Sequence, residues 1–195
     1  MARNSDCSQS LGSSATGRSV YVMGVDVSLT ALGMVVLTEG RAVRRLLCET
    51  KPLNQAPKFL KDGGVHPKTG VLFGSLEERI EFTRRRVMRV WRRYQPIITL
   101  FEGYSFASKG QGQRDRAELT GVLKNSVHRR GGLIPDSIAP RALKEWATGD
   151  GTADKDMMIE AACKAGFKTD NDNTADAFWL ATWAWDRTLG LLEPA

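Results

Sequence analysis

The sequence contains no long apolar run, only three cysteines and only two histidines. Its densest apolar stretch, Phe178–Trp185, is far shorter than the roughly 20 residues that a membrane-spanning helix needs, so we expect no membrane partner. Cys7, Cys48 and Cys163 are odd in number and widely spaced, which excludes a disulfide framework and a cysteine zinc site. Free cysteines are typical of a reducing compartment, and we therefore expect a cytoplasmic protein.

The charged residues give the chain a basic balance. Its 195 residues include 28 Lys and Arg against 22 Asp and Glu, a net charge of +6, and 42% of all residues are hydrophobic. This composition excludes wholesale disorder and fits one globular domain with a packed core. We place that domain at residues 19–195, because the Ser- and Gly-rich segment 1–18 is typical of a disordered leader. The excess of positive charge favours an anionic partner.

The pattern of apolar residues predicts an α/β fold with a mixed sheet. Short β-branched runs separated by turns indicate an antiparallel meander first, and alternating strands and helices follow it. The predicted strands are Ser19–Val27, Met34–Thr38, Ala42–Thr50, Ile97–Phe101 and Leu133–Ile138. The predicted helices run from Ser75 to Tyr94, Arg114 to His128, Arg141 to Ala147, Lys155 to Ala165 and Asn173 to Leu189, and Lys51–Gly74 is a long loop.

The helix predicted over residues 75–94 has two different faces. Ser75 and Glu78 have the spacing of a capping box at its start, and Pro96 ends it. One face is apolar, and the other carries Arg79, Arg85, Arg86, Arg89, Arg92 and Arg93. Arg85 and Arg89 on that face are candidates for contact with the phosphates of DNA, the alternative being an ordinary solvated face.

Acidic residues stand at the ends of apolar elements. Asp26 closes the first predicted strand, Glu102 closes the fourth, and Asp176 begins the last helix with Asp172 one turn earlier. A buried carboxylate needs a compensating cation or hydrogen-bond donors, and several acids at one place suit a hard divalent cation. Two such ions are a general device for phosphodiester hydrolysis. The alternatives are that Asp26 pairs with a buried arginine, that Glu102 only ends its strand, and that Asp172 or Asn173 caps the helix.

Four segments resemble, in order, the motifs of the RuvC-type Holliday junction resolvases. The resemblance covers the chain from residue 20 to about residue 185. It implies an RNase H-like fold with a five-stranded mixed sheet in the order 3-2-1-4-5, flanked by helices. It also implies a homodimer with two Mg²⁺ or Mn²⁺ ions in each active site that nicks a four-way DNA junction symmetrically, in DNA recombination and repair. The segments are Gly24–Gly33, Phe101–Tyr104, Thr152–Lys155 and Asp172–Phe178.

The resemblance also assigns roles within the active site. By position, Asp26, Glu102 and Asp176 are metal ligands. We assign the fourth position to Asp172 rather than to its neighbour in the sequence, because the amide of Asn173 is a poorer ligand for Mg²⁺ than a carboxylate. Lys155 stands where the family has a lysine near the scissile phosphate and would neutralise developing charge there, the alternative being a solvated lysine.

The segment after Glu102 is where the family contacts the centre of the junction. Aromatic side chains there would stack on unpaired bases, and basic side chains would meet phosphates. The aromatic residue of the bacterial pattern comes three residues after the glutamate, whereas Phe106 comes four after, so a side chain folded onto the core is the alternative. The candidates are Tyr104, Phe106, Lys109 and Arg114.

The sequence therefore predicts a metal-dependent endonuclease that acts on Holliday junctions or other branched DNA. A junction-binding protein without cleavage is the first alternative, and the amide at Asn173 is its support. Another RNase H-like or transposase-like nuclease is the second. An actin-like phosphotransferase would need two domains and glycine-rich phosphate loops, for which the chain is too short. The cytoplasm would be that of a bacterium or of a phage-infected host, an organelle being left open.

Overall fold

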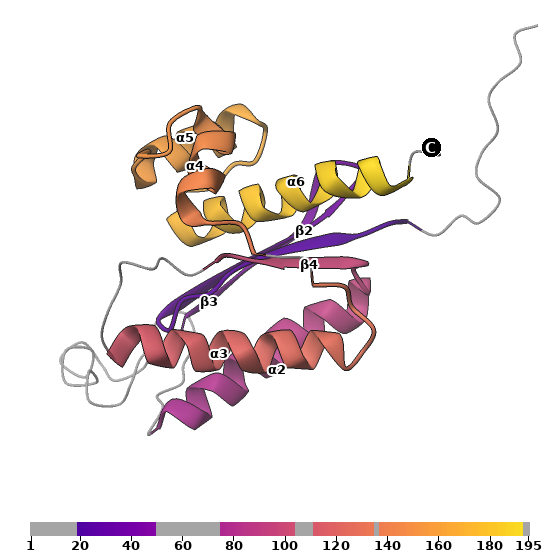
Figure 1. Cartoon of the computed structure of the whole chain (residues 1–195), viewed down its shortest axis with the longest axis vertical. Helices are drawn as coiled ribbons and strands as arrows, with labels where there is room; N and C mark the ends of the chain where they lie inside the picture. The colour runs from indigo at the N-terminus through magenta and orange to yellow at the C-terminus, as the bar shows by residue number, and fades with distance from the viewer. Residues whose placement is uncertain (1–18, 50–74, 104–110, 135–136, 193–195) are drawn as a thin grey trace, which may run out of the picture.

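A computed structural model of the chain describes residues 19–49, 75–103, 111–134 and 137–192. The predicted leader and the predicted long loop, as well as Tyr104, Phe106 and Lys109, lie outside these ranges. The described helices and strands form layers around one sheet (Figure 1). None of the described helices has the length and apolar character needed to cross a membrane.

The sheet begins with the predicted antiparallel meander. Strand β1 (Val22–Asp26) pairs with β2 (Ala31–Thr38), which pairs in turn with β3 (Arg41–Glu49). Strand β4 (Ile98–Phe101) lies on the other side of β1 and runs parallel to it, so the order is β3-β2-β1-β4. Because β1 and β4 are parallel, their carboxyl ends lie at the same edge of the sheet.

The prediction of a fifth strand is wrong for the part of the chain that the structure describes. Leu133 and Ile138 form only isolated parallel bridges, to Ile98 and Glu102, and the sheet has four strands there. Residues 135 and 136, between the two bridges, lie outside the described ranges. The second strand was predicted to begin at Met34, whereas β2 begins at Ala31, so the turn before it also lies earlier in the chain.

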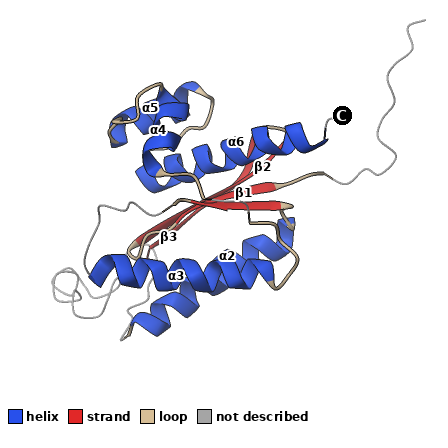
Figure 2. Ribbon diagram, in the orientation of Figure 1, coloured by secondary structure: helices blue, strands red, loops and turns tan. Residues whose placement is uncertain are grey.

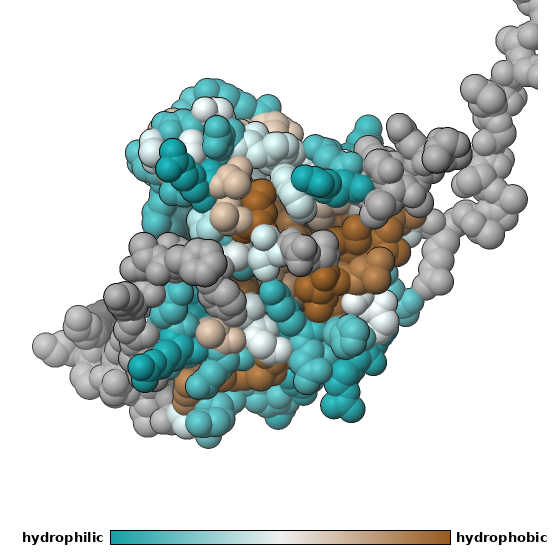
Figure 3. Space-filling model, in the orientation of Figure 1, coloured by the Kyte–Doolittle hydropathy of each residue, from teal (hydrophilic) through white to brown (hydrophobic). Residues whose placement is uncertain are grey.

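Helices cover both faces of the sheet (Figure 2). One face is covered by α2 (Leu76–Tyr94) and α3 (Gln111–His128), which begins three residues before the predicted start. The other face is covered by α6 (Asp172–Leu192), with α4 (Pro140–Thr148) and α5 (Lys155–Lys164) outside it. Hydrophilic side chains cover these outer layers, whereas apolar side chains show mainly at the level of the sheet (Figure 3).

The local signals of the sequence explain how α2 forms. The side chain of Ser75 accepts a hydrogen bond from the amide of Glu78 at 3.2 Å, as the capping spacing predicts. The helix ends at Gln95, which adopts a left-handed conformation with φ 47° just before Pro96. Its buried residues are Thr83, Val87, Met88, Val90 and Trp91, so the predicted apolar face is confirmed.

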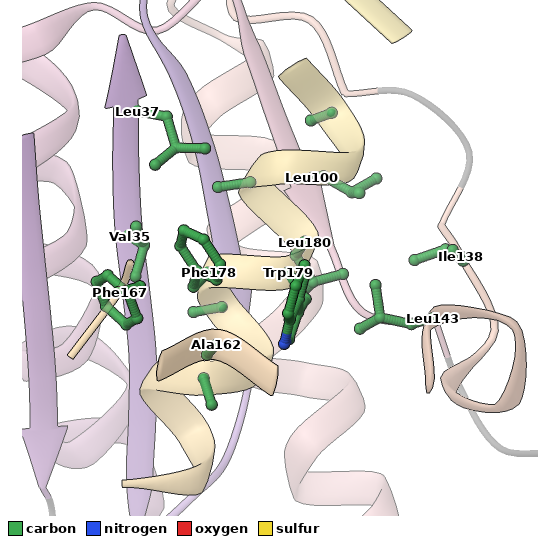
Figure 4. Packing of buried hydrophobic residues seen from close by; sticks show 14 of the residues in the cluster. Val35, Leu37, Leu100, Ile138, Leu143, Ala162, Phe167, Phe178, Trp179 and Leu180 are labelled. Atoms are coloured by element: carbon green, nitrogen blue, oxygen red, sulfur yellow. The ribbon is translucent and has the colours of Figure 1, made fainter. Parts of the chain in front are cut away.

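The α6 side of the sheet has its own apolar core (Figure 4). Phe178 of α6 stacks on Phe167 with ring centroids 4.6 Å apart, and the indole of Trp179 donates a hydrogen bond to the carbonyl of Met158 at 3.3 Å. These contacts join α6 to α5 and to the segment that follows α5.

Candidate active site

Asp26 is the last residue of β1 and is buried, with 7% of its surface exposed. Burial raises the pKa of its carboxyl well above the usual range, and the neighbouring charges of Glu102, Asp176 and Asp172 raise it further. Arg116 is the nearby group that lowers this pKa. The structure thus brings all four predicted acids within electrostatic reach of one another.

Glu102 follows β4 and meets a cation that sequence reasoning did not assign. Its carboxylate accepts a hydrogen bond from the guanidinium of Arg116 on α3, and the same guanidinium lies 3.9 Å from a carboxylate oxygen of Asp26. One alternative expected Asp26 to pair with a buried arginine; Arg116 does lie near Asp26, but its side chain is 29% exposed and its closer partner is Glu102. The sequence could not identify this arginine, because its approach depends on how α3 packs over the end of β4.

Two glycines allow α6 to lie directly on the backbone of the sheet. Gly33 is the cross-strand neighbour of Asp26, and a methyl group added to it would overlap the backbone carbonyl of Asn173 at the start of α6. A methyl group on Gly24 would overlap the backbone of the same helix at Ala177. The close approach places the first turns of α6 beside the end of β1.

Asp176 faces the other acids from the second turn of α6. Burial raises the pKa of its carboxyl to about 7, and the charges of Glu102 and Asp172 contribute to the increase, while Lys144 and Lys155 oppose it. At neutral pH this carboxyl is therefore close to half protonated without a further cation. A divalent ion bound beside this carboxyl would stabilise its charged form and lower its pKa.

The start of α6 is capped by a residue other than those predicted. The side chain of Asn171 accepts a hydrogen bond from the amide of Thr174 at 3.1 Å, which is the bond of an N-cap. The predicted capping role of Asp172 or Asn173 is thus wrong. Instead, Asn173 donates a hydrogen bond to Asp172 at 3.3 Å, and both belong to the first turn.

Lys155, the first residue of α5, forms an ion pair with Asp172. Burial alone would raise the pKa of Asp172, but the hydrogen bond and charge of Lys155 outweigh it, and the pKa is lowered. The same hydrogen bond, together with the charges of Asp172, Asp176 and Asp26, raises the pKa of Lys155. Its side chain is 80% exposed, so the ammonium group stands at the rim of the acidic site.

The chemistry of these donors fits a divalent cation. The carboxylates come from the end of β1, from the residue after β4 and from α6, and their oxygens are hard ligands. They repel one another, and the positive charge nearby is too small to balance them. Among the residues that the structure describes, no three acidic, histidine or cysteine side chains are grouped closely enough to hold one ion. Arg116 pairs with Glu102 and Asp26, and Lys155 pairs with Asp172, so a cation would have to exchange with these two side chains.

The remaining predicted DNA contacts that the structure describes come from two helices, α2 and α3. Arg114 is exposed near the start of α3, two residues from Arg116. Arg85 is 71% exposed on α2, but its guanidinium pairs with Glu81 at 2.8 Å. Arg89 is exposed one turn further along α2.

The described residues thus form a mixed sheet with acids at the shared carboxyl edge of its two parallel strands. No protein-family model matches the sequence, and no curated protein matches it. Among solved structures, the fold is similar to Thermus thermophilus RuvC, at 19% identity and a TM-score of 0.65, over 90% of this chain and 100% of that chain.

The same RuvC in complex with a Holliday junction substrate matches at 20% identity and a TM-score of 0.67, over 90% of this chain and 99% of that chain. The yeast mitochondrial Holliday junction resolvase Ydc2 matches at 12% identity and a TM-score of 0.57, over 92% of this chain and 84% of that one. The predicted RuvC-type fold is confirmed.

Proposed function

We propose that this protein is a metal-dependent endonuclease that resolves Holliday junctions or other branched DNA. The observation that carries the proposal is the convergence of Asp26, Glu102, Asp172 and Asp176 at one edge of the sheet, where they raise the pKa of Asp26 and Asp176. The fold supports it, because similar structures include a RuvC bound to a Holliday junction substrate and a mitochondrial resolvase.

The four acids would hold Mg²⁺ or Mn²⁺, with two ions in each site. When bound, such ions supply a water molecule of lowered pKa and stabilise the leaving oxygen of the phosphodiester. The chain's own residues then bind and orient the DNA. Lys155, which lies at the rim of the site, would hold a phosphate there, and Arg116 would release the Glu102 carboxylate when a metal ion binds. Paired symmetric nicks require two sites, so the proposal includes a homodimer.

The decisive experiment uses a synthetic four-way junction incubated with the protein and either Mg²⁺ or Mn²⁺. A linear duplex and an RNA–DNA hybrid of the same sequence are the controls. We expect paired nicks at symmetric positions, confined to the junction. Equal cutting of all three substrates would instead indicate a general or RNase H-like nuclease. Light scattering of the protein–junction complex tests the homodimer separately.

The Asp26→Asn variant separates cleavage from binding. It keeps the shape of the side chain but removes a charge from the centre of the acidic group, so nicking should stop while junction binding persists. A gel-shift titration in EDTA measures the binding. If this variant cuts the junction as fast as the wild type, the acids are not the catalytic group.

A junction-binding protein without cleavage is the second candidate function. The observation that favours it is that Arg116 and Lys155 already neutralise Glu102 and Asp172. On this alternative, the wild type binds the junction tightly but leaves it intact at every Mg²⁺ and Mn²⁺ concentration. Calorimetric titration with Mn²⁺ alone would then show no binding.

A further inference from the structure

The charges of α2 are unevenly distributed along the helix. Its first half, up to Arg85, contains three acids and three arginines, and Glu81 pairs with both Arg84 and Arg85 at 2.6 and 2.8 Å. No acid follows Glu81 in the helix. The second half of the helix therefore carries four arginines and no acid; the arginines are Arg86, Arg89, Arg92 and Arg93.

A residue from the edge of the sheet adds to this charge. Arg44 lies on the edge strand β3, opposite Val36, on the face of the sheet that α2 covers. Together with Arg89 and Arg93 it lines a hollow of about 470 Å³, completed by Val90 and Tyr94. We call this the arginine hollow.

None of the residues that line the arginine hollow is acidic. Among the described residues, no ion pair joins Arg44, Arg89 or Arg93 to an acid, and the guanidinium of Arg93 lies 5.8 Å from the ring centroid of Tyr94. The helix dipole favours a cation in the last turn, which accounts for Arg93. It does not account for Arg89 in the preceding turn or for Arg44 on another element.

Three guanidinium groups around one hollow repel one another in the free protein, so their arrangement favours an anionic ligand. Guanidinium groups bind phosphate through paired N–H donors, and phosphate is the repeating anion of DNA. The hollow is too small for a folded partner but accommodates a backbone phosphate.

The arginine hollow lies at the end of α2 that is remote from the acids. Near the start of α2, Arg79 donates a hydrogen bond of 2.5 Å to the carbonyl of Leu29, just after the Asp26 strand. At the other end, Tyr94 packs against Tyr21, which precedes β1, with ring centroids 5.3 Å apart. Figure 1 shows α2 crossing beneath the sheet between these ends. From Arg79 to Arg93 the helix rises about 21 Å along its axis, or roughly six base pairs of duplex.

We propose that the arginine hollow, formed by Arg44, Arg89 and Arg93, binds backbone phosphates of a duplex arm about six base pairs from the cleavage point. The contact is independent of sequence, because it involves phosphates alone. The inference rests on the proposed function, since it takes an arm of the branched substrate as the ligand. It adds a second anchoring point that orients the arm without touching the scissile bond.

The test compares two double variants that each lower the net charge of the chain by 2. Arg44→Gln/Arg93→Gln removes two charges from the hollow, whereas Lys164→Gln/Arg187→Gln removes two exposed charges from α5 and α6. Both are made in the Asp26→Asn background and measured in EDTA, so that no cleavage occurs. The substrate is a four-way junction with arms longer than the proposed span.

Two measurements on the bound junction read out the contact. The dependence of log K on log salt concentration should become shallower by about 2 for the hollow variant, and its affinity should fall at least about fivefold, with smaller changes for the control. Hydroxyl-radical footprinting should show lost protection on the arm, with the junction centre still protected. Unchanged slope and unchanged arm protection would overturn the inference. If the wild type itself leaves the junction centre unprotected, the proposed function fails instead.

A third measurement needs no DNA. Because the arginines of the hollow repel one another, Arg44→Gln/Arg93→Gln should unfold at a higher temperature than the control variant at low salt, and the difference should shrink as salt is added. Stabilisation together with unchanged DNA affinity would overturn the assignment of DNA as the ligand and indicate an acidic protein surface in its place.

Discussion

Replacing Asp176 by asparagine should stabilise the protein in the absence of metal. The carboxyl of Asp176 is buried beside Glu102 and Asp172, and its pKa is raised from 3.8 to about 7 in the folded state. A carboxyl that is more easily protonated when folded than when unfolded disfavours folding once it is charged. Asparagine has nearly the same shape and no charge, so the variant escapes this cost.

The size of the effect follows from the two pKa values. The interval from 3.8 to about 7 corresponds to about 4 kcal/mol of lost stability above pH 7, at about 1.36 kcal/mol per pKa unit. The cost is small near pH 4 and grows as the pH rises towards 7. Between pH 5 and pH 8 it amounts to about 2.5 kcal/mol, which is roughly 5–10 °C in Tm for a domain of this size.

Thermal unfolding in EDTA, followed by circular dichroism from pH 5 to pH 8, measures the difference between Asp176→Asn and the wild type. Asp172→Asn is the matched control, one helical turn away. The pKa of Asp172 is lowered by Lys155, so this variant should lose stability at neutral pH rather than gain it. The stability advantage of Asp176→Asn over the wild type should be larger at pH 8 than at pH 5. An advantage that is the same at both pH values would refute the crowding of charge at this site.

Two further substitutions test other parts of the site. Arg116→Met should bind Mn²⁺ more tightly than the wild type in calorimetric titration, because the guanidinium of Arg116 competes for the carboxylate of Glu102. Arg114→Met, on the same helix, is the control and should bind Mn²⁺ as the wild type does. Equal affinity of the two variants for Mn²⁺ would contradict the competition. Gly33→Ala should cost about 2 kcal/mol or more in chemical denaturation, because α6 must shift away from β2. Gly121→Ala is its control, since open space surrounds this helical glycine and alanine should stabilise by about 0.5–1 kcal/mol.

The sequence allowed much of the fold to be predicted, because the deciding interactions are local. The meander follows from short β-branched runs and turns, and α2 follows from a cap and an apolar stripe of helical period. The segment 133–138 has a composition that suits a strand, but its described residues form only two isolated bridges, to Ile98 and Glu102. The N-cap of α6 was misjudged because several neighbouring polar residues could each cap the helix. The hydrogen bond from the amide of Thr174 to the side chain of Asn171 identifies Asn171 as the cap.

The convergence of the acids could also be predicted, since a carboxylate at the end of a buried strand has few places to lie. Arg116 could not be assigned in the same way. It sits on an exposed-looking stretch of α3 among other charged residues, and only the packing of that helix directs it to Glu102. A basic side chain from a separate helix has no fixed sequence separation from the acid that it pairs with, so no motif identifies it.

The position of α6 in the chain has a consequence for biosynthesis. Asp26 and Asp176 come from opposite ends of the described chain, and β4 and α3 between them supply Glu102 and Arg116. A ribosome therefore completes the acidic group only with the last helix, and its contacts of large sequence separation form late in folding. Nascent or truncated chains lack the full set of charges, so any activity against DNA would appear only once the whole domain has folded.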